Sequence, residues 1–367
     1  MNRIMKIMKL TIFLLAGRLL WAEPGGYYEY GTALRRELPV ELLNPAFLAR
    51  FSRPEIYLGM GVRILQEERT TLVFDQFENT MGEAVYADNT TTSVRLSSLA
   101  GVFPFGKLGL GVKLTTERDF NYLYQKEYRD DFYVKVGEDR FQQQGFLYSG
   151  RISAGFMPVS LVSVGIGGQY LFGNRTQEQM IIRIPDTSSF QSVARLRGVG
   201  WCAGAGIFPS RRLQLGLSYQ SGVKLIAQDG ERMMTYPWVS ELTAQFWAPG
   251  ALPAKGYLSL GLTGWSGARS DFKNVISVAI GVEHLFLNLV QLDYGFGLEP
   301  LPNNPTVHRF IGLLGVGFDV NNYRFNIKTA LTRMELHADS SMVPFAGDGA
   351  RVYQNGVDLG LTIQYRF

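Results

Sequence analysis

The clearest pattern in this sequence is the alternation of apolar and polar side chains over short stretches. In residues 357–367, apolar side chains occupy every odd position from Val357 to Phe367, and polar residues or glycine stand between them. Successive side chains of a β-strand point to opposite faces of the sheet. Residues 357–367 are therefore predicted to form a strand with one apolar and one polar face.

The same alternation recurs along the chain and predicts fourteen strands, an even number as single-chain bacterial β-barrels require. In the second strand, Val94, Leu96, Ala100 and Val102 are assigned to the apolar, outward face. The predicted strands cover residues 56–64, 94–102, 108–114, 146–156, 162–172, 193–207, 213–219, 238–246, 258–262, 276–282, 292–298, 310–318, 323–331 and 357–367.

The links between these strands alternate in length. Short links follow the even-numbered strands, as at residues 104–106 and 321–322, whereas long loops are predicted at 69–92, 118–143, 174–191 and 337–352. Short periplasmic turns and long extracellular loops are typical of outer-membrane barrels. We therefore expect an all-β fold: a transmembrane antiparallel β-barrel of about fourteen strands in the outer membrane of a Gram-negative bacterium, in contact with its lipids and lipopolysaccharide.

Composition agrees with this fold class. The chain is 46% hydrophobic with a mean hydropathy of +0.00 and has 41 glycines among 367 residues. A helical membrane protein would be more apolar. Many of the glycines fall on the polar, inward faces, where they leave room for a plug, a ligand or water. Aromatic residues, including Phe103, Phe208 and Phe318, collect near the predicted periplasmic ends, as in the aromatic girdle of a membrane protein.

The N-terminus has the pattern of a cleaved signal peptide at residues 1–22, with a basic start, an apolar run and a small residue at Ala22. That segment holds four basic residues and no acids, so the remaining chain is formally neutral and gives no support for nucleic-acid binding. Residues 23–50 are predicted to form a plug, or hatch, in the barrel, the alternative being a periplasmic tail. Residues 51–367 form the predicted barrel.

Catalytic chemistry is not indicated. The three histidines have no metal-ligand spacing, and no nucleophile-elbow or zinc-protease motif occurs, so neither an enzyme nor a cofactor or metal is expected. Inward charges are explained either by salt bridges across the lumen or by a path that guides a ligand. The candidate lumen charges are Arg63, Arg95, Lys113, Arg151, Glu283, Asp293 and Arg324.

The predicted loop at 118–143 mixes charged residues with aromatic ones. Phe120, Tyr122 and Tyr124 are candidates for a ligand-capture groove, and packing of the loop against its neighbours explains them equally well.

Several short motifs resemble those of the FadL/TodX family of outer-membrane transporters for long-chain fatty acids and other hydrophobic compounds. They are Asn44-Pro45-Ala46 before the first strand, the strand opening Arg53 to Ile56, the run Pro104 to Gly111, the aromatic stretch Asp119 to Tyr122, and the strand pair between Gly281 and Gly297 with the link Pro300 to Pro305.

This resemblance implies passive diffusion of a hydrophobic small molecule through a plugged barrel, with Asn44, Pro45 and Ala46 as the hatch motif and sideways exit through a kinked strand. A barrel that docks or shuttles secreted proteins, as in type IX secretion, and a general porin are the alternatives. The C-terminal Phe367 is expected to be recognised by the barrel assembly machinery.

Overall fold

The computed structural model describes residues 42–367 except 184–185, 227–231, 249–252, 268–271, 287–288, 303 and 339–349. The predicted signal peptide and most of the predicted hatch segment lie outside these residues. The described elements are η3 (Pro45–Arg50), β1 (Glu55–Phe74), β2 (Thr80–Phe105), β3 (Leu108–Asp119), β4 (Tyr122–Arg129), β5 (Lys135–Gln144), β6 (Phe146–Val159), β7 (Val162–Arg183), β8 (Asp186–Ser210), β9 (Leu213–Gln220), β10 (Val223–Ile226), β11 (Arg232–Tyr236), β12 (Trp238–Ala248), β13 (Ala254–Gly264), β14 (Val275–Phe286), β15 (Val290–Pro300), β16 (His308–Val320), β17 (Tyr323–Ala338) and β18 (Ala350–Arg366).

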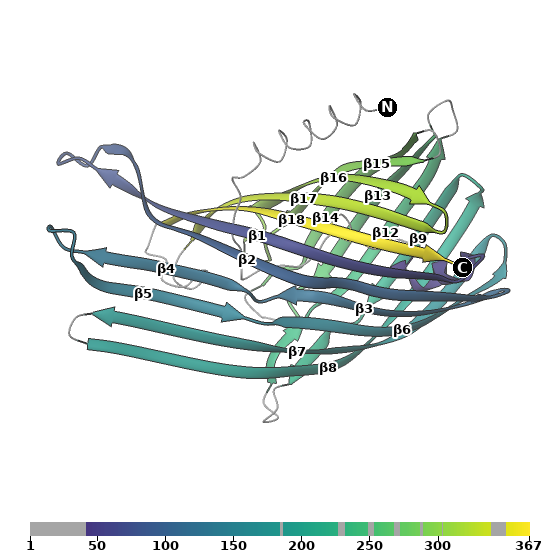
Figure 1. The fold of residues 1–367 in the computed structure, drawn as a ribbon, viewed down its shortest axis with the longest axis horizontal. Helices are drawn as coiled ribbons and strands as arrows, with labels where there is room; N and C mark the ends of the chain where they lie inside the picture. The colour runs from purple at the N-terminus through teal and green to yellow at the C-terminus, as the bar shows by residue number, and fades with distance from the viewer. Residues whose placement is uncertain are drawn as a thin grey trace.

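These segments form one closed antiparallel barrel of fourteen strands, which confirms the predicted fold (Figure 1). Four barrel strands are each interrupted once: β3 continues as β4, β5 as β6, β9 as β10, and β11 as β12. The first and last strands close the barrel, with Glu55 opposite Arg366 and Thr70 opposite Arg351. Among the described residues, no helix is long and apolar enough to cross a membrane.

The outer surface of the barrel carries a continuous band of exposed apolar side chains, here called the apolar belt. It includes Leu58, Val112, Ile166 and Leu361, each on a different strand. The belt ends part of the way along β1, because the outward residues after Ile64 are Gln66 and Glu68. The outward face of β1 is therefore polar just beyond Ile64.

The second strand departs from the predicted alternation. Opposite Gly59 and Met60 of β1, the register shifts by one residue at Ser97 of β2. A β-bulge of this kind moves every following side chain to the other face. Ala100 and Val102 are therefore buried inside the barrel, and their predicted outward placement is wrong.

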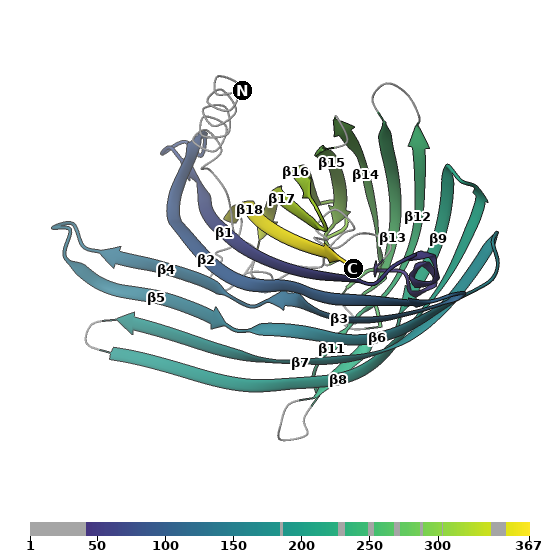
Figure 2. The same cartoon turned by 45° about the vertical axis from the view of Figure 1, so that its right-hand side comes forward.

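Three of the predicted loops are strands. β1 and β2 extend to a tip at residues 75–79, β4 and β5 pair across 122–144, and β7 and β8 pair as far as Arg183 and Asp186. We call these three hairpins, beyond the apolar belt, the crown. They project from the same end of the barrel (Figures 1 and 2). The opposite end, where β1 begins and β18 stops, is called the lower rim.

Candidate functional site: the barrel interior

A short segment, residues 44–49, is buried inside the barrel near the lower rim. Asn44 caps the 3-10 helix η3 by accepting a hydrogen bond from the backbone N–H of Ala46 at 3.0 Å, and Pro45 occupies the first turn, where its missing N–H costs nothing. Ala46, Phe47 and Leu48 are all buried. The predicted hatch motif therefore starts a helix that packs against the wall.

The side chain of Asn44 also fastens this helix to the barrel. Its Nδ2 donates to the backbone carbonyls of Ala205 on β8 at 3.2 Å and Leu217 on β9 at 3.1 Å. Because its Oδ1 is engaged by Ala46, the amide uses both of its donors and one acceptor site. An ionised aspartate could accept the hydrogen bond from Ala46 but, having no donor, could not bond the two carbonyls.

Inward glycines of neighbouring strands, among them β3, β6 and β7, make room for η3. A Cβ added to Gly109 would lie 2.1 Å from the carbonyl oxygen of Leu48, and one added to Gly155 would lie 2.3 Å from that of Pro45. On Gly165, a Cβ would lie 2.4 Å from the carbonyl carbon of Pro45. These distances are far below van der Waals contact, so only glycine permits this approach of backbone to backbone.

Phe208 packs against η3 inside the barrel and is not part of an outer aromatic girdle. Its ring lies 5.7 Å from that of Phe47, and the guanidinium of Arg50 stands 4.2 Å from its centroid. Phe208 is buried on the inner face of β8, so its predicted place among the membrane-facing aromatics is wrong. The sequence is misleading here because an aromatic residue near a strand end fits either face.

The candidate charges of β1 to β6 are all on inward positions. Arg63, Lys113 and Arg151 are buried, and Arg95 forms an ion pair with Asp358 of β18 at 2.9 Å. Arg151 donates to the side-chain oxygens of Gln169 at 3.2 Å and Gln220 at 2.7 Å.

The candidate charges of β14 to β17 also have partners across the strands. Asp293 pairs with Lys328 at 3.1 Å, and Arg324 makes two hydrogen bonds with Asp319, at 2.6 and 2.7 Å. Glu283 lies between Lys255 of β13 and the like-charged Asp293 of β15 in the register of the sheet. These ion pairs join strands that are adjacent or separated by one strand, so they run along the wall, and both the cross-lumen network and a role in guiding a ligand stay predictions. Within the described ranges, no cluster of metal-binding side chains is found.

The interruptions of four strands occur where the apolar belt ends. After β3, the carboxylate of Asp119 accepts hydrogen bonds from the backbone and side chain of Asn121 at 2.9 and 2.7 Å, which turns the chain out of the ladder. Between β5 and β6, Gly145 has φ +123°, a conformation suited to glycine. Pro237, which lacks an N–H, separates β11 from β12.

A seam runs between β2 and β4, where no backbone pairing is found among the described residues. Hydrogen bonds to side chains of β2 take the place of the missing backbone pairing. Thr91 Oγ1 accepts from the N–H of Leu123 at 3.0 Å, and Asn89 Oδ1 accepts from the N–H of Gln125 at 2.7 Å. The seam starts beside Val94, which is exposed at the upper edge of the apolar belt.

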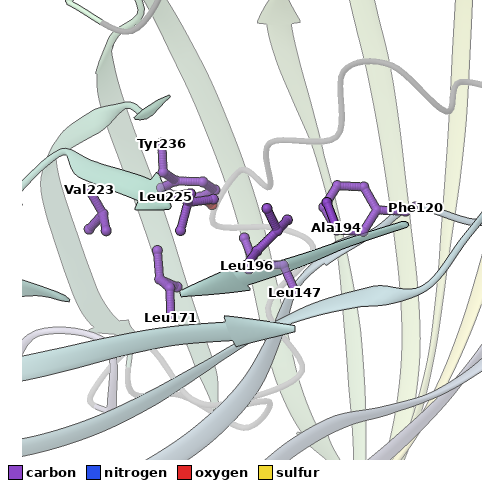
Figure 3. Close-up of a cluster of buried hydrophobic side chains, with 8 residues drawn as sticks. All are labelled: Phe120, Leu147, Leu171, Ala194, Leu196, Val223, Leu225 and Tyr236. Atoms are coloured by element: carbon purple, nitrogen blue, oxygen red, sulfur yellow. The ribbon is translucent and has the colours of Figure 1, made fainter. Parts of the chain in front are cut away.

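Eight buried apolar side chains gather inside the barrel at the level of these interruptions (Figure 3). Val223 of β10 packs onto the inner face of β8, since a Cβ on Gly198 would lie 2.5 Å from its side chain. This inner apolar cluster consists of Phe120, Leu147, Leu171, Ala194, Leu196, Val223, Leu225 and Tyr236.

Only Phe120 of this cluster was among the candidates from sequence. A signal for others is present: Leu147 and Leu171 are the middle residues of the apolar triplets 146–148 and 170–172. Such triplets break the alternation, and their middle residue must face inward when its neighbours face lipid. The triplets therefore mark apolar positions on the inward face of the barrel.

Tyr122 and Tyr124 are not on a loop. They lie on β4, point inward and are buried, so the capture loop predicted for them is wrong in its secondary structure. Tyr122 Oη donates to Glu67 at 2.9 Å and accepts from Arg69 at 2.8 Å, and the Arg69 guanidinium stands 3.8 Å from the ring centroid of Tyr124. These contacts tie β4 to β1 beneath β2, on the inner side of the seam.

Comparisons with known proteins agree with this architecture. A Pseudomonas aeruginosa FadL homologue superimposes with a TM-score of 0.63 at 14% identity, covering 95% of this chain and 99% of that one. The Pseudomonas putida toluene transporter TodX gives 0.60 at 11% identity, covering 89% and 94%, and the Ralstonia pickettii toluene transporter TbuX gives 0.58 at 14%, covering 89% and 93%. No curated protein matches the sequence. The BamG family model matches residues 35–229, which is more than half of the chain.

Proposed function

The chain belongs to the BamG family and has a FadL-type barrel, and from this premise we propose that it transports hydrophobic small molecules across the outer membrane of a Gram-negative bacterium. The inner apolar cluster carries the proposal. With eight members it is the largest of the clusters of buried apolar side chains found among the described residues. A site of this kind favours an apolar ligand over a hydrophilic one.

The apolar belt supports the membrane location. Its side chains face outward on all sides of the barrel, where hydrocarbon would cover them, while the backbone groups are paired within the wall. Lipids and lipopolysaccharide are then the surroundings of the barrel. Phe367 stands exposed at the end of the closing strand and suits recognition by the barrel assembly machinery.

The proposed route is passive. Ligand enters through the crown, binds at the inner apolar cluster and leaves sideways at the seam between β2 and β4, where side-chain hydrogen bonds replace a backbone ladder. Long-chain fatty acids and small aromatic hydrocarbons both fit an apolar site of this kind. The named structural neighbours are transporters, and no catalytic role is proposed.

The N-terminal segments complete the proposal. Residues 1–22 act as the signal peptide, and residues 23–50 act as the hatch. The burial of η3 against β3, β6, β7 and β8 supports the hatch for the part that the structure describes.

A second candidate function is favoured by the BamG family match, whose name indicates a link to the barrel assembly machinery. In that case the barrel would serve as a docking partner. Depletion of the protein would then lower the amounts of other outer-membrane barrels, an effect that a transporter of hydrophobic compounds would not produce.

The double substitution Leu171→Ser and Leu196→Ser tests transport. Both side chains belong to the inner apolar cluster, and each contributes about 1.5–3 kcal/mol when it covers apolar ligand surface. We expect uptake of radiolabelled oleate or toluene at low concentration to fall about tenfold or more, since ~1.4 kcal/mol corresponds to a factor of ten.

Val199→Ser is the matched control, because Val199 lies on the same strand as Leu196 but faces outward. Both variants must reach the membrane as heat-modifiable, folded barrels. Equal uptake by the double variant and the control would refute transport through this cluster.

A further inference from the structure

Two of the three hairpins of the crown, β4–β5 and β7–β8, are joined by side-chain contacts above the apolar belt. Arg183 of β7 pairs with Asp139 of β5 at 2.8 Å, and Lys135 of β5 pairs with Glu127 of β4 at 3.1 Å. Tyr128 donates to Asp139 at 2.6 Å, and burial together with this hydrogen bond raises the pKa of Tyr128 to about 12, so it remains a donor at neutral pH. The hairpins β4–β5 and β7–β8 are therefore held together beyond the membrane.

The tips of β1–β2 and β4–β5 share one backbone design. Asp75 accepts hydrogen bonds from the N–H groups two and four residues later at 2.8 and 2.9 Å, and Asp130 does the same at 2.9 Å for both. The fourth residue of each tip has a positive φ, 63° at Glu78 and 62° at Tyr133. Hydrogen bonds from Asn79 and Phe77 lower the pKa of Asp75, so this turn is set by an ionised carboxylate.

These fixed tips hold large aromatic side chains out in solvent. Phe77 is 73% exposed, Phe132 85% and Tyr133 81%. A left-handed backbone is uncommon for a bulky residue such as tyrosine. Exposed aromatic residues on a rigid support are the typical anchors of protein interfaces.

The tips are also acidic. Residues 74–82 and 130–134 contain four acidic residues and no lysine or arginine. The nearest cations are engaged, since Arg129 pairs with Glu127 at 2.6 Å and Lys135 pairs with Glu127 and Glu138. The exposed surface at the tips thus combines negative charge with aromatic rings.

We propose that the tips of β1–β2 and β4–β5 form a docking surface for a second protein, whose matching face carries lysine or arginine side chains around an apolar pocket. A guanidinium or ammonium group is attracted both by the carboxylates and by the faces of the aromatic rings. Lipopolysaccharide phosphates would be repelled by the same carboxylates, and so would the acidic tips of a second copy of this chain. This inference goes beyond transport and does not depend on it.

Two double variants of the full-length protein test the surface. Phe77→Ser with Phe132→Ser removes two anchors, and Glu78→Lys with Asp131→Lys reverses charge at the same tips. The control is Leu161→Ser, which removes an exposed apolar side chain at the lower rim. A photo-crosslinking amino acid at position 132 is introduced separately into the otherwise unchanged chain.

The barrel is purified in mild detergent from its own outer membrane and run on native gels. We expect a stoichiometric complex with one protein, cross-linked from position 132 to a lysine- or arginine-rich face, and disrupted by added salt. Each double variant should reduce the complex about tenfold or more, in line with the loss of interface anchors, and the control should keep it.

Three results would overturn the proposal: no complex, a complex that both double variants retain, or cross-links only to lipopolysaccharide or to a second copy of the chain. Uptake of oleate or toluene is measured on the same strains and should equal that of the parent. A loss of the complex with normal uptake separates docking from transport, and the Leu171 and Leu196 variant should show the opposite pattern.

Discussion

The substitution Gly165→Ala should displace η3 from the barrel wall without lowering the stability of the barrel. The added methyl group would lie 2.4 Å from the carbonyl carbon of Pro45 and 2.5 Å from the backbone nitrogen of Ala46. Ordinary contact needs about 1 Å more, because carbon atoms pack best about 3.5–4.0 Å apart. The atoms in the way are backbone, so no side-chain rotation relieves the clash and the helix must move.

The size of the effect depends on how closely η3 is packed against the wall. Overpacking of a fitted site costs roughly 1–3 kcal/mol, which corresponds to a shift in the seated population of about fivefold to 150-fold. On β7 itself, alanine is more favourable than glycine by roughly 0.5–1 kcal/mol, since glycine loses more backbone freedom on folding. The wall should therefore be as stable as before while the hatch opens.

Single-channel conductance in planar bilayers measures this effect. We expect the Gly165→Ala barrel to spend a larger share of time in an open state than the parent. A cysteine introduced at Phe47 should react faster with a water-soluble maleimide in the same background. Gly168→Ala is the matched control, three residues away on β7, where an added Cβ meets nothing within 4 Å. If Gly165→Ala and Gly168→Ala show the same conductance and the same labelling rate, the packing of η3 against the wall does not close the pore.

Two further predictions concern the hatch and the belt. Asn44→Asp and Asn44→Ala both lose the two hydrogen bonds to the carbonyls of Ala205 and Leu217, each worth about 1 kcal/mol. Alanine also loses the hydrogen bond from the N–H of Ala46, which aspartate keeps, but an ionised carboxylate is repelled by the two carbonyls that it faces. We expect this repulsion to outweigh the kept cap, so that Asn44→Asp opens the pore more than Asn44→Ala, and the opposite ranking in conductance would contradict this. Leu361→Arg should lower the free energy of unfolding by about 2–4 kcal/mol, because it places a charge near the bilayer midplane. Urea titration in lipid vesicles measures this effect, with Leu361→Met as the control. Equal stability of the two variants would mean that position 361 is not in contact with hydrocarbon.

The fold was predictable because hydrocarbon outside and polar groups inside impose a strict alternation on every strand that crosses the membrane. The same reasoning failed at β2, since a bulge at Ser97 exchanges the two faces beyond it, and both faces there carry apolar residues, with Leu99 and Phe103 on the outer one. Ala100 and Val102, apolar and apparently in phase with Val94, are inside the barrel for this reason.

The crown escaped prediction for a different physical reason. Above the belt the outer face is not in contact with hydrocarbon. Outward positions there are occupied by polar residues such as Gln66 and Gln125, and the alternation of apolar and polar residues is lost. The strands persist because the backbone ladder and ion pairs such as Arg183 to Asp139 hold them. Alternation indicates contact with lipid, so it does not predict strands whose backbone pairing continues beyond the membrane.

The position of the hatch relative to the inner apolar cluster has a consequence for the route. On β7, Gly165 supports η3 and Leu171 belongs to the cluster, and six residues of strand separate them by about 20 Å. The seam begins beside the cluster, close to Phe120, and not beside η3. A ligand that leaves through the seam therefore never passes the hatch. Gly165→Ala should then raise the conductance for ions while leaving the uptake of a hydrophobic probe near that of the parent. If uptake instead rises in step with conductance, the ligand travels along the barrel axis past η3, and sideways exit at the seam is wrong.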